Sequence, residues 1–109
     1  MATPEGKIQN AILKYLKSQG HFCFRVNNGA IHDAKLNDGY GGYRSNPSLM
    51  KGVPDIILIA DDGVFVGIEV KAPKGIQSAD QMLFERRCKL KNGRYHVVRS
   101  VEEVKELGF

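Results

Sequence analysis

The chain has 109 residues, of which 42% are hydrophobic and 26% charged, a balance typical of one soluble globular domain. No apolar run is long enough to span a membrane and no signal-peptide pattern opens the chain, so we expect a cytoplasmic protein without a membrane partner. The formal net charge of +4 suits a nucleic-acid partner but does not by itself require one. Cys23 and Cys88 lie in apolar patterns, which favours reduced core residues over a disulfide or a metal site.

The first elements predicted are a helix and a strand. Pro4 is a typical first helical residue, apolar residues then recur at helical spacing, and Gly20 ends the pattern. The alternation of Phe22, Phe24 and Val26 predicts a half-buried strand over residues 21–26. One sequence does not decide whether these two rings lie in the core or at an interface.

Residues 27–53 show no hydrophobic period and are rich in Asn and Gly. A structureless loop of such length is uncommon in a compact domain and is usually functional or disordered. Its aromatic residues Tyr40 and Tyr43, with Arg44, favour a function such as stacking on an unpaired base.

The second half of the chain alternates strands and helices. A strand with apolar residues on both faces, as expected of a central strand, turns at Asp61-Asp62-Gly63 into a further strand. Capping boxes that start at Ser78 and Ser100 each begin a helix. The predicted strands cover 54–60, 64–71 and 94–99, and the predicted helices cover 78–91 and 100–107. The order α-β-β-β-α-β-α predicts a single α/β domain over residues 1–109, with a small mixed sheet flanked by helices.

Three charged residues interrupt the apolar strands of the predicted hairpin. A turn centred on Asp62 pairs residues whose numbers sum to 124, which places Asp55 opposite Glu69 with β-carbons about 4.5–5.5 Å apart. Lys71 lies two residues further and shares their face. A salt-bridged cluster on a surface hairpin is the structural alternative to a functional site.

The paired carboxylates point to metal chemistry. Two adjacent carboxylates repel each other unless a proton or a cation lies between them. Oxygen ligands of this kind are those that Mg²⁺ and Mn²⁺ prefer, and a bound ion can activate water. Lys71 is then placed to orient that water or to stabilise charge on a phosphate. We therefore predict metal-assisted hydrolysis of a phosphodiester.

Four segments, in this order, resemble the virus-type replication-repair nuclease (VRR-NUC) family of the PD-(D/E)xK superfamily. They are Gly52-Val53-Pro54-Asp55, Glu69-Val70-Lys71, Ser78-Ala79-Asp80-Gln81 and the segment from Arg94 to Glu103. The resemblance implies a restriction-endonuclease-like core and DNA cleavage that depends on Mg²⁺ or Mn²⁺. It also implies a stand-alone, phage-like member that acts in the host cytoplasm as a homodimeric Holliday-junction resolvase on branched DNA.

The same resemblance assigns roles to the hairpin residues. Asp55 and Glu69 become metal ligands, the backbone carbonyl of Val70 a third ligand, and Lys71 the catalytic lysine. Gln81 is either only the third residue of a capping box or, as in related nucleases, a catalytic glutamine near the metal.

The first helix departs from the family pattern, in which a glutamate commonly faces the metal. The best-matching position holds Gln9, which would act on the metal directly or through water, while Glu5 lies one turn earlier on the same face. We favour Gln9, because Glu5 is equally explained as an acid that answers the helix dipole.

Further residues are expected to contact DNA: Asn28, Arg44, Lys51 and Lys74. Asn28-Gly29 is equally compatible with a plain turn, whereas Lys74 lies between Pro73 and Gly75 in chain expected to be exposed. Two other functions stay open at this point, namely a monomeric flap or nicking nuclease and a DNA-binding module without catalysis.

Overall fold

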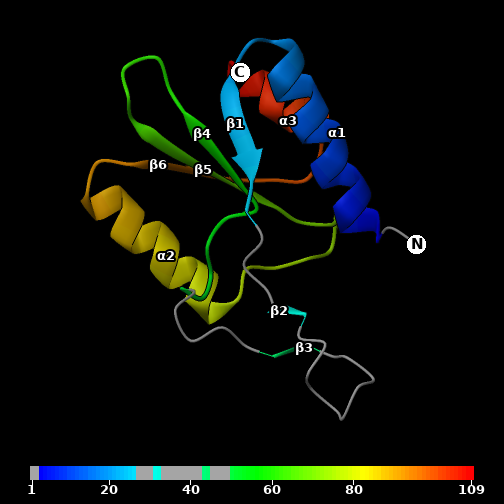
Figure 1. Ribbon diagram of the computed structural model, residues 1–109, viewed down its shortest axis with the longest axis vertical. Helices are drawn as coiled ribbons and strands as arrows, with labels where there is room; N and C mark the ends of the chain where they lie inside the picture. Colours follow the sequence, from blue (N-terminus) through cyan, green and yellow to red (C-terminus); the bar gives the residue numbers. More distant parts are fainter. Residues whose placement is uncertain (1–2, 27–30, 33–42, 45–49) are drawn as a thin grey trace.

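The computed structural model describes residues 3–26, 31–32, 43–44 and 50–109. A four-stranded sheet in the order β1-β4-β5-β6 lies between α1 and α3 on one face and α2 on the other (Figure 1). The helices are α1 (Pro4–Ser18), α2 (Ala79–Leu90) and α3 (Val101–Glu106), and the strands are β1 (Phe22–Arg25), β4 (Ile56–Ile59), β5 (Phe65–Val70) and β6 (Arg94–Val98). The pairs β1·β4 and β4·β5 are antiparallel and β5·β6 is parallel, so the sheet is mixed. None of the helices in these ranges is long and apolar enough to cross a membrane.

The predicted α/β class and the order of its seven elements are confirmed, with one addition. A two-stranded ladder pairs β2 (Ile31–His32) with β3 (Tyr43–Arg44). The prediction that residues 27–53 contain no regular structure was therefore wrong for these two strands. Strands of two residues are too short to produce the alternation from which a strand is inferred, which needs roughly four to eight residues.

The β4–β5 hairpin has the predicted register. Ile56 pairs with Ile68 and Ile57 with Gly67, so that the numbers of opposed residues sum to 124. The turn is closed by the side chain of Asp62, whose Oδ1 accepts a hydrogen bond of 3.1 Å from the amide of Val64. The register is set locally by the turn, and it brings Asp55, one residue before β4, to the level of Glu69.

The hydrophobic core lies between the sheet and the α1–α3 layer. Ile12 and Leu16 of α1 are fully buried, as is Val104 of α3. The other buried core residues are Cys23, Ile56, Leu58, Val66, Ile68, Val70 and Val98. Because side chains alternate along a strand, the intervening residues of β5 face α2 instead, and Glu69 is one of them.

The first strand is half-buried as predicted, but its buried side chain is Cys23. The rings of Phe22 and Phe24 are 68% and 43% exposed, whereas Cys23 is 7% exposed beneath α1. A period of two residues shows that the faces of a strand differ, but only the packing of a neighbouring helix decides which face is covered. Both Cys23 and Cys88 are free thiols, and Cys88 is half-buried.

Candidate active site

The two predicted carboxylates meet at one end of the β4–β5 hairpin. Oδ2 of Asp55 accepts a hydrogen bond of 2.7 Å from the amide of Val70, the residue next to Glu69. Glu69 is 1% exposed and Asp55 is half-buried. The Asp55 carboxyl is close enough to Glu69 to raise the pKa of the Glu69 carboxyl. The structure therefore places them together on the face of the sheet that carries α2.

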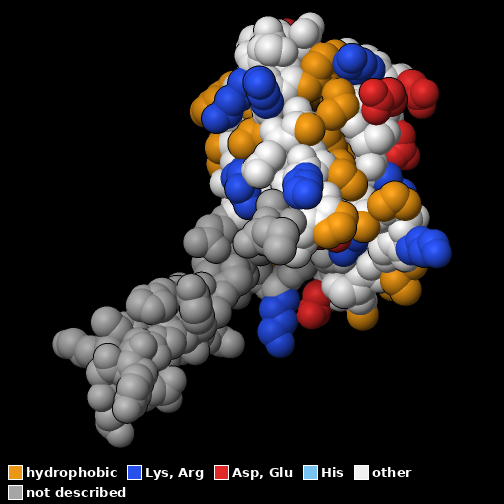
Figure 2. Space-filling model, turned by 90° about the vertical axis from the view of Figure 1, so that its right-hand side faces the viewer, with side chains coloured by type: hydrophobic (Ala, Val, Ile, Leu, Met, Phe, Trp, Pro, Cys, Tyr) orange, Lys and Arg blue, Asp and Glu red, His pale blue; other side chains and the backbone are white. Residues whose placement is uncertain are grey.

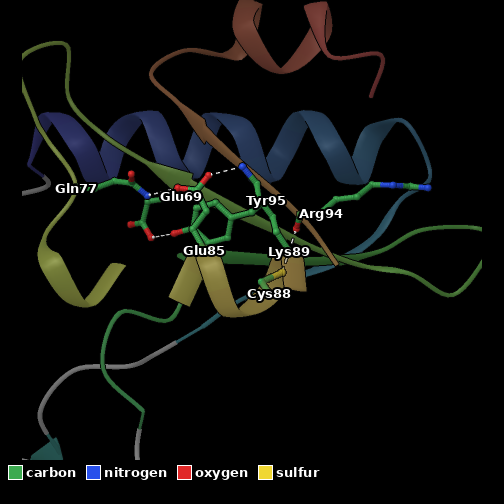
Figure 3. A network of polar contacts seen from close by, with 7 residues as sticks. All are labelled: Glu69, Gln77, Glu85, Cys88, Lys89, Arg94 and Tyr95. Carbon is green, nitrogen blue, oxygen red and sulfur yellow. Dashed lines mark hydrogen bonds and ion pairs between the residues drawn. The ribbon is translucent and has the colours of Figure 1, made fainter. Parts of the chain in front are cut away.

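Both oxygens of Glu69 receive hydrogen bonds from outside the hairpin. Nε2 of Gln81 donates to Oε1 at 2.9 Å, and the hydroxyl of Tyr95 donates to Oε2 at 3.0 Å (Figure 3 draws the second bond). These donors come from α2 and β6, so three elements converge on one carboxylate. This arrangement fixes the position of a buried side chain.

Gln81 makes both kinds of contact that the sequence left open, one within the capping box and one with the candidate site. Its backbone amide donates a hydrogen bond to Oγ of Ser78, and its side-chain Oε1 accepts one of 2.8 Å from the backbone amide of Ser78. These two bonds complete the capping box of α2. Its Nε2 remains free to reach Glu69. One glutamine thus begins the helix and contacts the candidate site, while its catalytic role remains a prediction.

The electrostatics of the site favour a bound proton or cation. Burial, followed by the hydrogen bond and the charge of Asp55, raises the pKa of Glu69 to about 8. The hydrogen bond from Tyr95 and the charge of Lys71 oppose that rise. Burial and the nearby Glu69 carboxylate raise the pKa of the Tyr95 hydroxyl, so it remains a hydrogen-bond donor. Two carboxyl groups in so little water are costly to ionise together.

Lys71 follows β5 directly and is 9% exposed. Its amide donates a hydrogen bond of 3.0 Å to the carbonyl of Val98, which extends the parallel pairing with β6. The loop beyond Lys71 is attached to β6 by Nη2 of Arg99, which donates to the carbonyl of Gly75 at 3.0 Å. These contacts fix the backbone around Lys71, whose positive charge acts on Glu69.

Gly52 fits the segment before Asp55 against the start of α2. It has a φ of 78°, and a β-carbon there would lie 2.3 Å from the carbonyl oxygen of Asp80. Only glycine allows both this backbone conformation and this approach. The contact holds the first turn of α2, which carries Gln81, beside the chain that leads into the hairpin.

The first-helix candidates lie on the buried side of α1. Gln9 is 8% exposed and shares its helix face with Ile12 and Leu16, while Glu5 is half-buried one turn earlier. Within the part of the chain that the structure describes, neither side chain forms a hydrogen bond with Asp55 or Glu69. The choice between Gln9 and Glu5 thus stays a prediction.

The expected DNA contacts are spread over several elements. Lys51 and Lys74 are exposed. Arg44 lies in β3, where it pairs with Ile31, and Asn28 and Tyr40 lie outside the described residues. On the side of the molecule where α1 lies, basic side chains are scattered among hydrophobic and acidic ones rather than gathered (Figure 2). The described residues drawn on that face form no continuous basic surface.

Tyr95 is the site residue that sequence reasoning missed. It is 4% exposed and pairs with Gly67, whose missing side chain leaves room for its ring. Beside it, Nε2 of Gln77 donates to Oε1 of Glu85 at 3.1 Å (Figure 3). The sequence does place a tyrosine in a predicted strand and a glycine two residues before Glu69. Their pairing, however, can be recognised only once β6 is known to lie beside β5.

Comparisons with known proteins agree on one family. The model of the VRR-NUC domain matches residues 3–102. A solved structure titled "VRR_NUC domain" superposes with a TM-score of 0.67 and 22% identity, covering 97% of this chain and 95% of that one. At that identity the likeness shows a shared fold. No curated protein matches the chain.

Proposed function

Because this chain belongs to the VRR-NUC domain family, whose members are nucleases of the PD-(D/E)xK type, we propose that it is a structure-selective DNA endonuclease. In this proposal a divalent ion, Mg²⁺ or Mn²⁺, assists cleavage, and a homodimer resolves Holliday junctions. The observation that carries the proposal is the pair Asp55 and Glu69, brought together on the α2 face beside the buried ammonium of Lys71.

The donor set fits a hard divalent ion. Two carboxylates from adjacent positions supply oxygen ligands, and the carbonyl of Val70 is the proposed third. Among the residues that the structure describes, no group of three or more His, Cys, Asp or Glu side chains is arranged to hold a metal. Sites for Mg²⁺ commonly use one or two carboxylates and complete their coordination with water and substrate phosphate, so two carboxylates are sufficient.

The side chains of the site have separate tasks in the proposed reaction. Asp55 and Glu69 would hold the ion, which would neutralise them and supply a nucleophile at neutral pH. Gln81 and Tyr95 hold the Glu69 carboxylate by one hydrogen bond to each oxygen. The ammonium of Lys71 orients the attacking water or stabilises the negative charge that develops on the phosphate.

The proposed homodimer follows from the reaction. Cleavage of two opposed strands of a junction by one small site per chain requires two sites related by a two-fold axis. Selectivity in this proposal comes from the shape of the DNA, because contacts to phosphates position a protein without reporting the base sequence.

Cleavage of labelled DNA tests the proposal. We expect the purified protein to cut a four-way junction with Mn²⁺ or Mg²⁺ and to leave it intact in EDTA. The variants Asp55→Ala and Lys71→Ala should lower the cleavage rate by at least about 10²–10³, because the first removes a proposed ligand of the ion and the second removes the cation proposed to act on the reacting phosphate. Asp61→Ala is the matched control, since Asp61 is an exposed carboxylate in the turn of the same hairpin.

Three results separate this proposal from its alternatives. Junction binding by Asp55→Ala should persist while cleavage is lost, whereas joint loss of binding and folding would show a structural cluster. Cleavage of flaps or single nicks by a species with the solution mass of a monomer would refute the resolvase. Binding of DNA without cleavage in any metal would leave only a DNA-binding module.

A further inference from the structure

A groove beside α2 does not belong to the site described above. Its main hollow has a volume of about 470 Å³. Its apolar floor and walls include Met50, Phe65, Phe84 and Leu90. Its basic rim includes Arg87 and Lys91. Concave apolar hollows of a few hundred Å³ are the usual form of ligand sites.

The floor of the groove continues the sheet face that carries the carboxylates. Phe65 lies on the same face of β5 as Glu69 and four residues before it, which corresponds to about 13 Å at 3.3 Å per residue. The rings of Phe65 and Phe84 lie 6.2 Å apart at 45°, and Phe84 lies 6.1 Å from the ring of Tyr95. The groove and the candidate active site are therefore connected by packed aromatic rings, at a separation of roughly four nucleotides along one stacked strand.

The rim of the groove is basic. A second hollow of about 180 Å³ shares Met50, Phe84 and Arg87 with the first and adds Lys51 and Asp80. With Lys91, the described lining thus contains three cations and one carboxylate. The second hollow extends the groove toward the start of α2, where Gln81 contacts Glu69. An anionic ligand that follows the groove would be led to the carboxylate site.

The groove has no protein covering among the described residues. No residue of α2 is buried, and Met50, Leu83 and Leu90 are 51%, 53% and 73% exposed. An exposed apolar strip rimmed by charges marks a binding surface. A second copy of the chain seated here about a two-fold axis would bring the same cations together, which is unfavourable. A polyanion that carries flat apolar groups fits both the rim and the floor.

We propose that this groove binds an unpaired stretch of the DNA substrate, with bases stacked on Phe65 and Phe84 and phosphates paired with Arg87, Lys91 and Lys51. The proposal rests on the proposed nuclease function and specifies its substrate class as branched DNA with single-stranded bases next to the cleavage site. Aromatic rings stack on any base, so the groove recognises unpaired structure rather than sequence.

A pair of phenylalanine variants tests the stacking. The probes are a labelled twelve-nucleotide thymidine oligomer and a blunt duplex of the same length, measured by fluorescence anisotropy in EDTA. We expect Phe65→Leu to weaken binding of the oligomer by at least about 10-fold and binding of the duplex by less than about 2-fold, because a base loses its stacking partner. Phe22→Leu makes the same change at an exposed position outside the groove and should leave both affinities unaltered. An equal loss for both probes, or no loss, overturns the proposal.

A tryptophan reporter tests the position independently of the phenylalanine floor. The chain contains no tryptophan, so Leu90→Trp places a single reporter in the groove and Leu107→Trp places one just after the C-terminal end of α3. Both leucines are exposed, which protects the fold from either change. We expect the oligomer to quench the Leu90→Trp emission and to leave the Leu107→Trp emission unchanged. The proposal is overturned if the oligomer binds but the emission of the Leu90→Trp protein does not change. It is also overturned if that emission changes with protein concentration alone, which would indicate a second copy of the chain in the groove.

Failure of the groove can be distinguished from failure of the nuclease. If the Leu90→Trp protein cuts a four-way junction with Mn²⁺ but its emission ignores the oligomer, only the groove is refuted. If the wild-type protein neither binds nor cuts any of the DNA probes, the proposed function itself is refuted.

Discussion

The two faces of the central sheet are built from the same strands and differ in almost every property. On β5, Val66, Ile68 and Val70 are buried beneath α1 and α3, whereas Glu69 faces α2 and is held by hydrogen bonds. The α1 layer is closed and apolar, while α2 has no buried residue at all. Alternate residues of one strand therefore support stability on one side and chemistry on the other.

The difference shows how so small a domain can hold one buried and one half-buried carboxyl group side by side. The hydrophobic layer supplies the folding free energy, so the opposite face can carry groups that are costly to bury. The polar side is then organised by hydrogen bonds from Gln81 and Tyr95 rather than by close apolar packing. Substitutions on the two faces should accordingly have different consequences.

The largest expected difference is in stability. Ile68→Ala empties a fully buried position of the α1 face and should lower the free energy of unfolding by about 2–5 kcal/mol. Ile57→Ala, on the half-buried α2 face, should cost about 1 kcal/mol because less apolar surface is lost. Urea unfolding in EDTA measures both, and equal costs would show that the two faces are equally closed.

A smaller effect should follow from the loss of one hydroxyl on the α2 face. Tyr95→Phe removes the hydrogen bond to Oε2 of Glu69 and should weaken Mn²⁺ binding by about 10–100-fold, as loss of a partner that orients a metal ligand does. Tyr15→Phe is the control, since the Tyr15 hydroxyl donates to the carbonyl of Phe109 at 2.7 Å in the α1 layer. Calorimetric titration measures both proteins. Similar losses would mean that the Tyr95 hydroxyl has no specific effect on the ion.

The pKa of Glu69 predicts how pH acts on the metal-free protein. Its folded-state pKa is raised from 4.5 to about 8, so between these values the folded state holds a proton that the unfolded state has lost. The stabilisation is present below pH 4.5 and disappears as pH rises toward 8, with a slope of at most about 1.4 kcal/mol per pH unit.

The substitution Glu69→Gln isolates this effect. The neutral amide has no proton to release, so the stability of the variant should fall less than that of the wild type between pH 5 and pH 8. Chemical unfolding in EDTA across this range provides the comparison. Parallel curves for the two proteins would show that Glu69 titrates normally.

The smallest expected effect comes from changing the exposed ring of Phe22 on β1, a strand whose neighbouring residues face opposite ways. Phe22→Ser alters an exposed ring and should change the unfolding free energy by less than about 0.5 kcal/mol. Cys23→Ser places a hydroxyl in the core and should cost about 1–3 kcal/mol, although far fewer atoms change. Thermal unfolding of both variants tests the contrast, and a greater loss for Phe22→Ser would place that ring in an interface.

The features that were predictable from the sequence are those that depend on neighbours along the chain. The helix starts at Pro4 and Ala79 follow from capping residues next to them, and the hairpin register follows from a three-residue turn. That register is enough to pair Asp55 with Glu69. The family resemblance agrees with the matched domain and with the fold.

The features that were missed depend on partners far away in the chain. Tyr95 reaches Glu69 only because β6 returns parallel to β5 after α2, and the register of such a crossover is not set by a turn. The exposure of Phe22 and the burial of Cys23 depend likewise on where α1 packs.

By itself the sequence determined where helices begin, how the hairpin pairs and which two carboxylates meet, because turns, caps and strand periodicity act within a few residues. Only the tertiary structure decided which sheet face is closed and which side chains hold Glu69. Helix packing and parallel pairing join residues distant in the chain, and no local pattern specifies their partners.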